Sequence, residues 1–120
     1  MYTYSQSTGV LARNGATVGH GYSGHGAGRN NPAMQAAPNV GPIPQGQYKI
    51  GPPFDTPPSA HGPHVMRLIQ APGTDTFGRD GFLMHGDNPQ HDASEGCIIM
   101  PPDVRNAVSA SGDTDLTVTA

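Results

Sequence analysis

Short runs of alternating or continuous apolar residues follow one another along the chain, and glycine or proline lies between most of them. Runs of this kind, roughly four to eight residues long and bounded by turn formers, are typical of β-strands. Ser7-Thr8 and the strong turn dipeptide Asn14-Gly15 are placed to join the first three runs as hairpins. The pattern predicts strands at Thr3–Gln6, Gly9–Arg13, Ala16–Gly19, Gln47–Ile50, Val65–Gln70, Gly81–Gly86, Cys97–Met100 and Leu116–Thr119.

One segment has a helical pattern. Pro101–Ser109 opens with proline and aspartate residues that suit a first helical turn, and Val104 and Val108 share a face four residues apart. Many short strands with one short helix favour a mainly β fold, a small antiparallel β-sandwich or open barrel. Gly24–Pro44 and Pro52–Pro63 are rich in glycine or proline and are predicted as long loops, which in a small domain are usually functional or mobile.

Length and charge narrow the class of protein. The 120 residues are enough for a single domain, 1–120. The formal net charge is −3 and no basic stripe exists, so we expect no nucleic-acid partner. A single cysteine excludes an intrachain disulfide. Met1–Gln6 has neither the positive nor the apolar region of a signal peptide, and no run is long enough to span a membrane, so we expect synthesis in the cytoplasm.

The candidate chemistry lies between Phe82 and Met100. His85 ends one apolar run, and Cys97 begins the next. A free thiol is only a few per cent thiolate at neutral pH, and a neighbouring imidazole can take its proton. If the two runs are adjacent strands, the imidazole and the thiol meet at one edge of the sheet. Gly96 lets the backbone turn tightly before the nucleophile, which can aim the Cys97 N–H at a developing oxyanion.

A third group is needed to fix the tautomer of the imidazole. Asp87, Ser94 or a backbone carbonyl are the candidates, and the sequence does not choose between them. We expect His85 to lower the pKa of Cys97, so that the thiol reacts faster than a free thiol near about pH 6–7. His61 and His64 flank a proline-rich loop and are interpreted as structural or exposed.

The run His85-Gly86 followed by Ser94-Glu95-Gly96-Cys97-Ile98 resembles the signature of the YkuD-type L,D-transpeptidases, which is His-Gly, a spacer and then Ser/Thr-His-Gly-Cys. Nearly the full length is also similar to the small L,D-transpeptidase-like domains of type VI secretion effectors. The segments that carry this second resemblance are Tyr4–Gly9, Gly21–Gly24, Asn30–Pro32, Gly41–Tyr48, Phe77–Arg79, Phe82–Asp87, Ser94–Ile99 and Arg105.

The resemblance implies a barrel of the L,D-transpeptidase type that acts on the stem tetrapeptides of peptidoglycan. Cys97 would attack the carbonyl of the third residue, and D-Ala would leave with a proton from His85. Water would complete an L,D-carboxypeptidase reaction, and a D-amino acid would give exchange. The resemblance further implies an antibacterial toxin, a monomer that acts in the periplasm of a target cell and is matched by an immunity protein.

The residues themselves and the resemblance together give the expected site residues. The expected catalytic group is Cys97, His85, Gly96, Ser94 and Asp87. The expected substrate-binding group is Tyr22, Ser23, Asn30, Arg79, Glu95 and Arg105.

Two positions depart from the larger family. Glu95 stands where that family has a second histidine, and Ile99 where it often has an arginine suited to a substrate carboxylate. Arg105, Arg79 or Arg29 is expected to take that place, because a guanidinium fork suits carboxylates. The shorter spacer favours hydrolysis over cross-linking with a bulky acceptor.

Two alternative functions remain open from the sequence. A non-catalytic peptidoglycan-binding module would keep the groove without a reactive thiol. A zinc-dependent wall hydrolase would gather His85, Asp87, His91 and Cys97 around a metal. The spacing of these four matches no common closed zinc site and only one thiolate is present, so we expect no metal and no cofactor.

Overall fold

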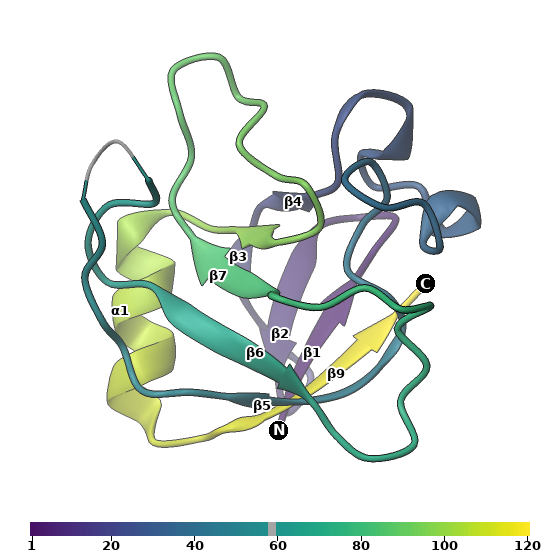
Figure 1. The fold of residues 1–120 in the computed structure, drawn as a ribbon. Helices are drawn as coiled ribbons and strands as arrows, with labels where there is room; N and C mark the ends of the chain where they lie inside the picture. The colour runs from purple at the N-terminus through teal and green to yellow at the C-terminus, as the bar shows by residue number, and fades with distance from the viewer. Residues whose placement is uncertain (58–59) are drawn as a thin grey trace.

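A single curved sheet forms most of the computed structural model, which describes residues 1–57 and 60–120 (Figure 1). In the described residues its strand order is β3-β2-β1-β9-β5-β6-β7-β8-β4. The edge strands β3 and β4 follow each other in the chain across Gly21, so the sheet almost closes into a barrel. The strands are β1 (Tyr2–Ser5), β2 (Val10–Arg13), β3 (Ala16–His20), β4 (Tyr22–Ser23), β5 (Gly46–Ile50), β6 (Met66–Gln70), β7 (Leu83–His85), β8 (Ile98–Ile99) and β9 (Asp115–Thr119).

The mainly β fold with one helix is confirmed, and so is the first pair of hairpins. β1 and β2 pair antiparallel with Tyr4 opposite Leu11, and β2 pairs antiparallel with β3. Asn14 and Gly15 have φ angles of 50° and 85°, the two positive values that a type I′ turn requires. Local turn chemistry therefore determines this end of the sheet.

Two pairings are parallel rather than antiparallel, β1 with β9 and β7 with β8. Parallel neighbours need a crossover connection of roughly a dozen residues, and the loop at 86–97 supplies one between β7 and β8. The sequence pattern did not predict this, because a strand's own residues look the same in either direction. The parallel pairing matters for the site, because the loop returns the chain to begin β8 beside β7.

The predicted long loops contain more structure than expected. The segment 24–44 holds two 3₁₀ turns, η1 (Gly26–Gly28) and η2 (Pro32–Met34). Strand β4 was not predicted, since two residues carry no alternating pattern; it pairs with β8. In the loop at 52–63, Phe54 forms a bridge with Val65, while positions 58 and 59 lie outside the described residues. The loops at 24–44, 52–63 and 86–97 rise from the same end of the barrel (Figure 1).

Helix α1 (Pro102–Ser111) confirms the predicted helix and extends it by two residues at its C-terminal end. Proline opens its first turn and Gly112, with φ of 72°, ends it in the left-handed region. Val104 and Val108 are buried against the sheet and belong to one core with Tyr2, Tyr4, Leu11, Ile43, Tyr48, Met66, Met84, Ile98 and Leu116. In the part of the chain that the structure describes, no helix has the length and apolarity needed to cross a membrane.

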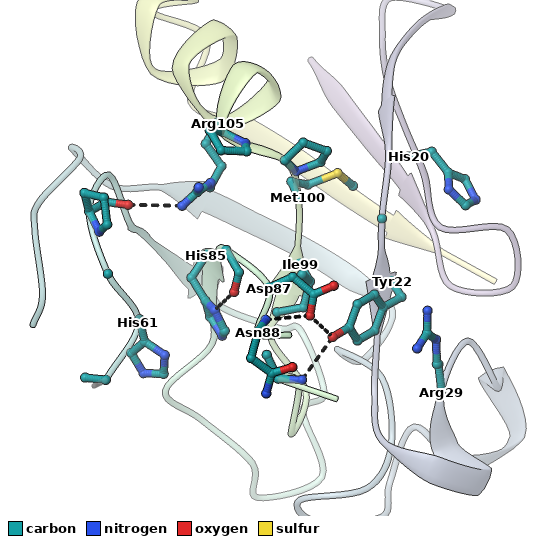
Figure 2. A pocket seen from close by; sticks show the side chains of 18 residues that line it. His20, Tyr22, Arg29, His61, His85, Asp87, Asn88, Ile99, Met100 and Arg105 are labelled. Carbon is teal, nitrogen blue, oxygen red and sulfur yellow. Dashed lines mark hydrogen bonds between the residues drawn. The ribbon is translucent and has the colours of Figure 1, made fainter. Parts of the chain in front are cut away.

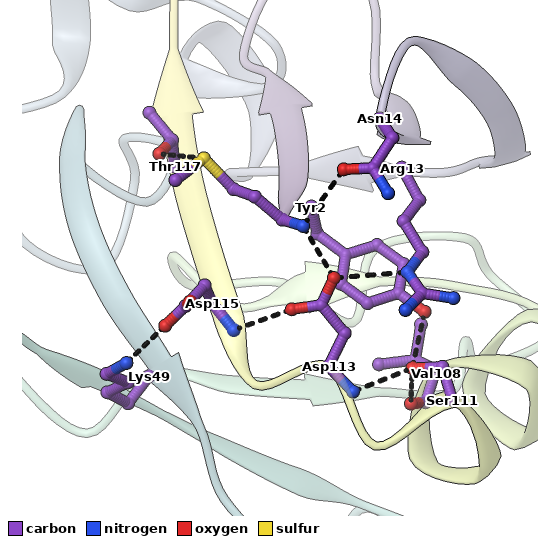
Figure 3. Close-up of polar contacts among 10 residues, drawn as sticks. Tyr2, Arg13, Asn14, Lys49, Val108, Ser111, Asp113, Asp115 and Thr117 are labelled. Atoms are coloured by element: carbon purple, nitrogen blue, oxygen red, sulfur yellow. Dashed lines mark hydrogen bonds and ion pairs between the residues drawn. The ribbon is translucent and has the colours of Figure 1, made fainter.

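A polar cluster around Asp113 holds the connection between α1 and β9 against the start of β1 (Figure 3). Its carboxylate accepts hydrogen bonds from the amino group of Met1 at 2.6 Å and from Nε of Arg13 at 3.1 Å. The bond from that amino group is the main reason that the pKa of Asp113 is lowered to about 2. Tyr2 adds a bond from its hydroxyl to Ser111 Oγ at 2.9 Å. These contacts fix the position of β9 beside β1.

Candidate active site

His85 ends β7 with its side chain only 2% exposed. Nδ1 lies 2.8 Å from the carbonyl oxygen of Gly86, and because a carbonyl only accepts, Nδ1 carries the proton and Nε2 carries the lone pair. Among the described residues Nε2 is buried without a hydrogen-bond partner. Burial is the main cause that lowers the pKa of His85, and nearby His61 and Arg105 lower it further. The imidazole is therefore a neutral base with a free Nε2.

Cys97 lies immediately before β8, and β8 pairs with β7, the strand that His85 ends. Met84 pairs with Ile98 and His85 with Ile99, so Cys97 falls opposite Leu83 in the same register. Alternation along the strands then directs the side chains of Cys97 and His85 to the same side of the sheet. Both residues line one cavity of about 610 Å³. The predicted meeting of the two segments as neighbouring strands is confirmed.

The expected thiolate–imidazolium pair is not what the structure favours. No hydrogen bond joins the sulfur to His85 within the described residues. Burial raises the pKa of the Cys97 thiol and the Glu95 carboxylate adds to this, while the Leu83 N–H and Arg79 oppose it. The prediction of a lowered pKa was wrong, because burial disfavours both charged forms of the dyad. Burial therefore favours the neutral thiol and the neutral imidazole.

Ser94 and Gly96 shape the turn that presents the thiol. Ser94 is fully buried; its hydroxyl donates to the Cys97 carbonyl at 2.6 Å and accepts from the N–H groups of Gly24 and Gly96 at 2.9 and 3.2 Å. Gly96 has φ of 127°, and a Cβ there would lie 2.4 Å from Nη2 of Arg79. Neither residue contacts the imidazole, so Ser94 is a positioning residue rather than its orienting partner.

Asp87 likewise does not orient His85, a role taken by the Gly86 carbonyl (Figure 2). Its carboxylate accepts from the hydroxyl of Tyr22 at 2.6 Å and from Nδ1 of His91 at 2.8 Å. Burial raises the pKa of Asp87, but these bonds and one from the Asn88 N–H outweigh it and leave the pKa lowered. Burial and the bond to Asp87 raise the pKa of Tyr22 to about 12. The pair fastens the 86–97 loop to β4.

Ser23 and Asn30, predicted to bind substrate, form hydrogen bonds with backbone groups of the protein itself. The buried Ser23 hydroxyl accepts from the Ile43 N–H at 2.8 Å and donates to the Gly96 carbonyl at 3.3 Å. The side-chain oxygen of Asn30 accepts from the Ser23 N–H at 3.2 Å. Of the residues that the structure describes, these two line neither cavity at the site. Short polar side chains beside glycine do not reveal whether they face a cleft or backbone.

Two of the three candidate arginines, Arg79 and Arg29, form hydrogen bonds with backbone carbonyls of the protein itself. Arg79 is buried and donates to four backbone carbonyls, those of Gln35, Pro42, Gly41 and Glu95. Arg29 lies over the ring of Tyr22, with its guanidinium carbon 3.8 Å from the ring centroid, and donates to the His91 carbonyl at 2.9 Å. Both guanidinium groups therefore hold loops together around the site.

Arg105 is the arginine with donors to spare. It projects from α1, is 5% exposed, and donates from Nη1 to the Pro63 carbonyl at 3.0 Å. Over the described residues its buried Nε has no partner. Burial lowers its pKa, and no carboxylate of the described chain forms an ion pair with it. A buried guanidinium in this state is suited to receive a carboxylate from a ligand.

Two cavities meet at His85. The first, of about 610 Å³, contains Cys97 and also Glu95, whose side chain is exposed. The second, of about 770 Å³, contains Tyr22 and Arg105. The residues that line both cavities are His61, His85, Asn88 and Ala93. In residues 1–57 and 60–120, no group of three or more histidine, cysteine or acidic side chains is arranged to hold a metal ion.

Sequence reasoning missed one residue of the site. His61 lines both cavities, and its ring centroid lies 4.3 Å from that of His85 (Figure 2). It was interpreted as structural or exposed, because nothing in its proline-rich segment relates it to β7. Its contact with His85 depends on how the 52–63 loop folds back over the barrel.

Comparison with known proteins gives a family match and a structural likeness. The model of the Tlde1 domain family matches residues 17–115. The crystal structure of Mycobacterium tuberculosis L,D-transpeptidase 1 is similar over 100% of this chain and 61% of that chain, with a TM-score of 0.54 and 16% sequence identity. This chain thus spans less than two thirds of that protein. No curated protein matches the sequence. The structural likeness shows that the barrel has the L,D-transpeptidase fold.

Proposed function

This chain belongs to the Tlde1 domain family, the L,D-transpeptidase-like domains of type VI secretion effectors. We propose that it is an enzyme with a cysteine nucleophile that acts on the stem tetrapeptides of peptidoglycan. The observation that carries the proposal is the buried, unpartnered Nε2 of a neutral His85 at the cavity that also holds the Cys97 thiol. A free base and a nucleophile on adjacent strands are the two parts that acyl transfer requires.

The proposed reaction begins with transfer of the thiol proton to Nε2 of His85. The sulfur attacks the carbonyl carbon of the third stem residue, the C–N bond to D-Ala breaks, and Nε2 gives its proton to the departing amine. Water then gives a proton to Nε2 and attacks the thioester, and the thiolate leaves and recovers that proton. A D-amino acid amine in place of water gives exchange. A neutral Cys97 and a neutral His85 fit this order of steps, since no charge has to be buried before substrate arrives.

Arg105 is the proposed ligand for the carboxylate of D-Ala. The scissile carbonyl would lie at Cys97 in the first cavity, and the leaving residue would extend past His85 into the second. Its carboxylate would bond the guanidinium group of Arg105, which lines that second cavity. An incoming D-amino acid carries the same carboxylate, so this site serves hydrolysis and exchange alike. Glu95 and Tyr22 would line the path of the peptide.

Both reactions consume the tetrapeptide donor and so would weaken cross-linking of the wall. The proposed setting is the periplasm of a target cell, reached through a type VI secretion system, and the proposed partner is an immunity protein that covers the two cavities. A monomer suffices, because one chain supplies the nucleophile, the base and the arginine. The alternative is a wall-binding module, which would bind the same peptide without changing it.

Digestion of purified tetrapeptide muropeptides, read by mass spectrometry, tests the proposal. The wild-type protein is expected to remove one D-Ala, and Cys97→Ala and His85→Ala are expected to lose this activity by about a thousandfold or more. His25→Ala, at an exposed histidine away from both cavities, is the matched control and is expected to match the wild type. Tetrapeptide that binds but keeps its D-Ala would support the binding module, and a cut elsewhere would indicate an endopeptidase.

A further inference from the structure

The proposed mechanism does not use the imidazole of His61, which lines both cavities. Its ring centroid lies 4.3 Å from that of His85, with 40° between the ring planes (Figure 2). His61 comes from the 52–63 loop and is exposed, whereas His85 ends β7 and is buried. One face of the buried base is thus covered by a second, solvent-facing imidazole.

The backbone around His61 holds this contact in place. The His61 N–H donates to Oγ1 of Thr56 at 3.0 Å, and the Thr56 N–H donates to the Gly62 carbonyl at 2.8 Å. The Thr56 hydroxyl adds a bond to the same carbonyl at 2.9 Å. The next carbonyl, that of Pro63, accepts from Arg105 on α1. The loop is therefore tied to itself on one side and to the helix on the other.

The charges that face His85 come from three elements. Arg105 approaches from α1, Asp87 from the 86–97 loop and His61 from the 52–63 loop. Asp87 is already bonded to Tyr22 and His91. His61 is the one of the three whose ring packs on that of His85.

We propose that His61 is a positioning residue for the base, whose ring shields His85 from water and whose proximity disfavours a second positive charge on the pair. This keeps His85 neutral with Nε2 available to the Cys97 thiol. The proposal rests on the proposed function and deepens it, because it assigns to the exposed loop the task of maintaining the base form of His85. His61 itself does not touch the reacting atoms.

Two variants separate shielding from charge. His61→Phe keeps a ring over His85 and removes the ionisable group, whereas His61→Ala removes both. His64→Asn is the loop-matched control, since His64 bonds Ser109 on α1 at 2.6 Å and has a φ of 58° that asparagine tolerates. The readouts are kcat and KM for D-Ala release, and the titration of the His85 imidazole by NMR, assigned with His85→Gln.

The midpoint of the His85 titration is expected to be lowest in the wild type, higher in His61→Phe and highest in His61→Ala. The total rise is expected to be about half a pH unit or more. His61→Ala is expected to lower kcat about tenfold with KM changed less than about twofold, and His61→Phe to recover most of kcat. His64→Asn is expected to match the wild type in both readouts.

Equal midpoints in the wild type and both His61 variants would overturn the proposal, whether or not D-Ala is released. Equal kcat values in wild type and His61→Ala would also overturn it. If the wild type releases no D-Ala while the midpoints keep the expected order, the proposed function fails and the shielding of His85 is supported, so the two failures are distinguishable.

Discussion

At the scale of single residues, the environment of Cys97 determines when its thiol reacts. Burial raises its pKa and the Glu95 carboxylate adds to that effect, because a negative neighbour disfavours a thiolate. The rate of alkylation by iodoacetamide is therefore expected to rise with a midpoint above about pH 8.5, the ordinary value for a thiol. Glu95→Gln is expected to lower that midpoint, and Asp80→Asn, at an exposed carboxylate not bearing on the sulfur, to leave it unchanged.

A midpoint near about pH 6–7 would mean that a thiolate–imidazolium pair exists before substrate binds, contrary to the neutral dyad described above. Measurement of the modified fraction by intact mass at a series of pH values is sufficient to distinguish the two cases.

Gly96 provides a second test at the same scale. Its φ is 127°, and a Cβ added there would lie 2.4 Å from Nη2 of Arg79, so we expect Gly96→Ala to lower the free energy of unfolding by about 3 kcal/mol or more. Gly81→Ala is the control, because Gly81 has φ of 74° but nothing within 4 Å of a Cβ, so only the backbone cost of about 1 kcal/mol applies. Urea unfolding gives both values, and equal losses would remove the steric argument.

The sequence revealed the nucleophile and the base but not their supporting contacts. Cys97 stands out because it is the single cysteine, and His85 because it ends an apolar run beside glycine. The group that orients the imidazole is the backbone carbonyl of Gly86, which no sequence pattern marks. Ser94, Asp87 and a backbone carbonyl were the three candidates for that role, and Ser94 and Asp87 instead bond backbone and Tyr22, partners that only the folded chain brings near.

At the scale of elements, the 86–97 loop carries the site and is fastened by Tyr22. The Tyr22 hydroxyl donates to Asp87 at 2.6 Å and accepts from the Ala93 N–H at 3.0 Å, so it bridges both ends of the loop. Tyr22→Phe is expected to lower the free energy of unfolding by about 2 kcal/mol and to speed hydrogen exchange in this loop. The pKa of Asp87 is expected to rise toward its ordinary value, because a bond to its charged form is lost.

Tyr4→Phe is the matched control for this prediction. The Tyr4 hydroxyl is buried and, among the described residues, has no hydrogen-bond partner, so its removal is expected to change stability by less than about 0.5 kcal/mol or to increase it. Unchanged exchange in the 86–97 loop of Tyr22→Phe would show that other contacts, such as that of Arg29 with His91, hold the loop.

Most strands and the helix were predictable because their signals are local, in the period of apolar residues and in turn dipeptides such as Asn14-Gly15. The pairing of β7 with β8 was not predictable in its direction, since it depends on a loop without a pattern of its own. Strand β4 was missed for the same reason, because its two residues are recognisable only from their pairing with β8.

At the scale of the whole molecule, the barrel brings three loops to one end (Figure 1). His85 lines both cavities there, and Cys97 lines the first. Arg79 and Arg29 use their guanidinium groups to join these loops, whereas Nε of Arg105 has no hydrogen-bond partner among the described residues. The sequence predicted that the loops at 24–44 and 52–63 are functional or mobile. It could not predict which arginines bond backbone carbonyls, because those carbonyls are distant in the chain.

In the proposed reaction, Cys97 forms a thioester with the third stem residue, and His85 takes the thiol proton and gives it to the departing amine. Rapid mixing with a tetrapeptide, an acid quench and intact-mass analysis test it most directly. We expect the protein to gain the mass of the peptide without its D-Ala. Digestion is expected to locate this adduct on the fragment that contains Cys97, and Cys97→Ala is expected to lack it. Release of D-Ala by Cys97→Ala, or an adduct on any other residue, would contradict it.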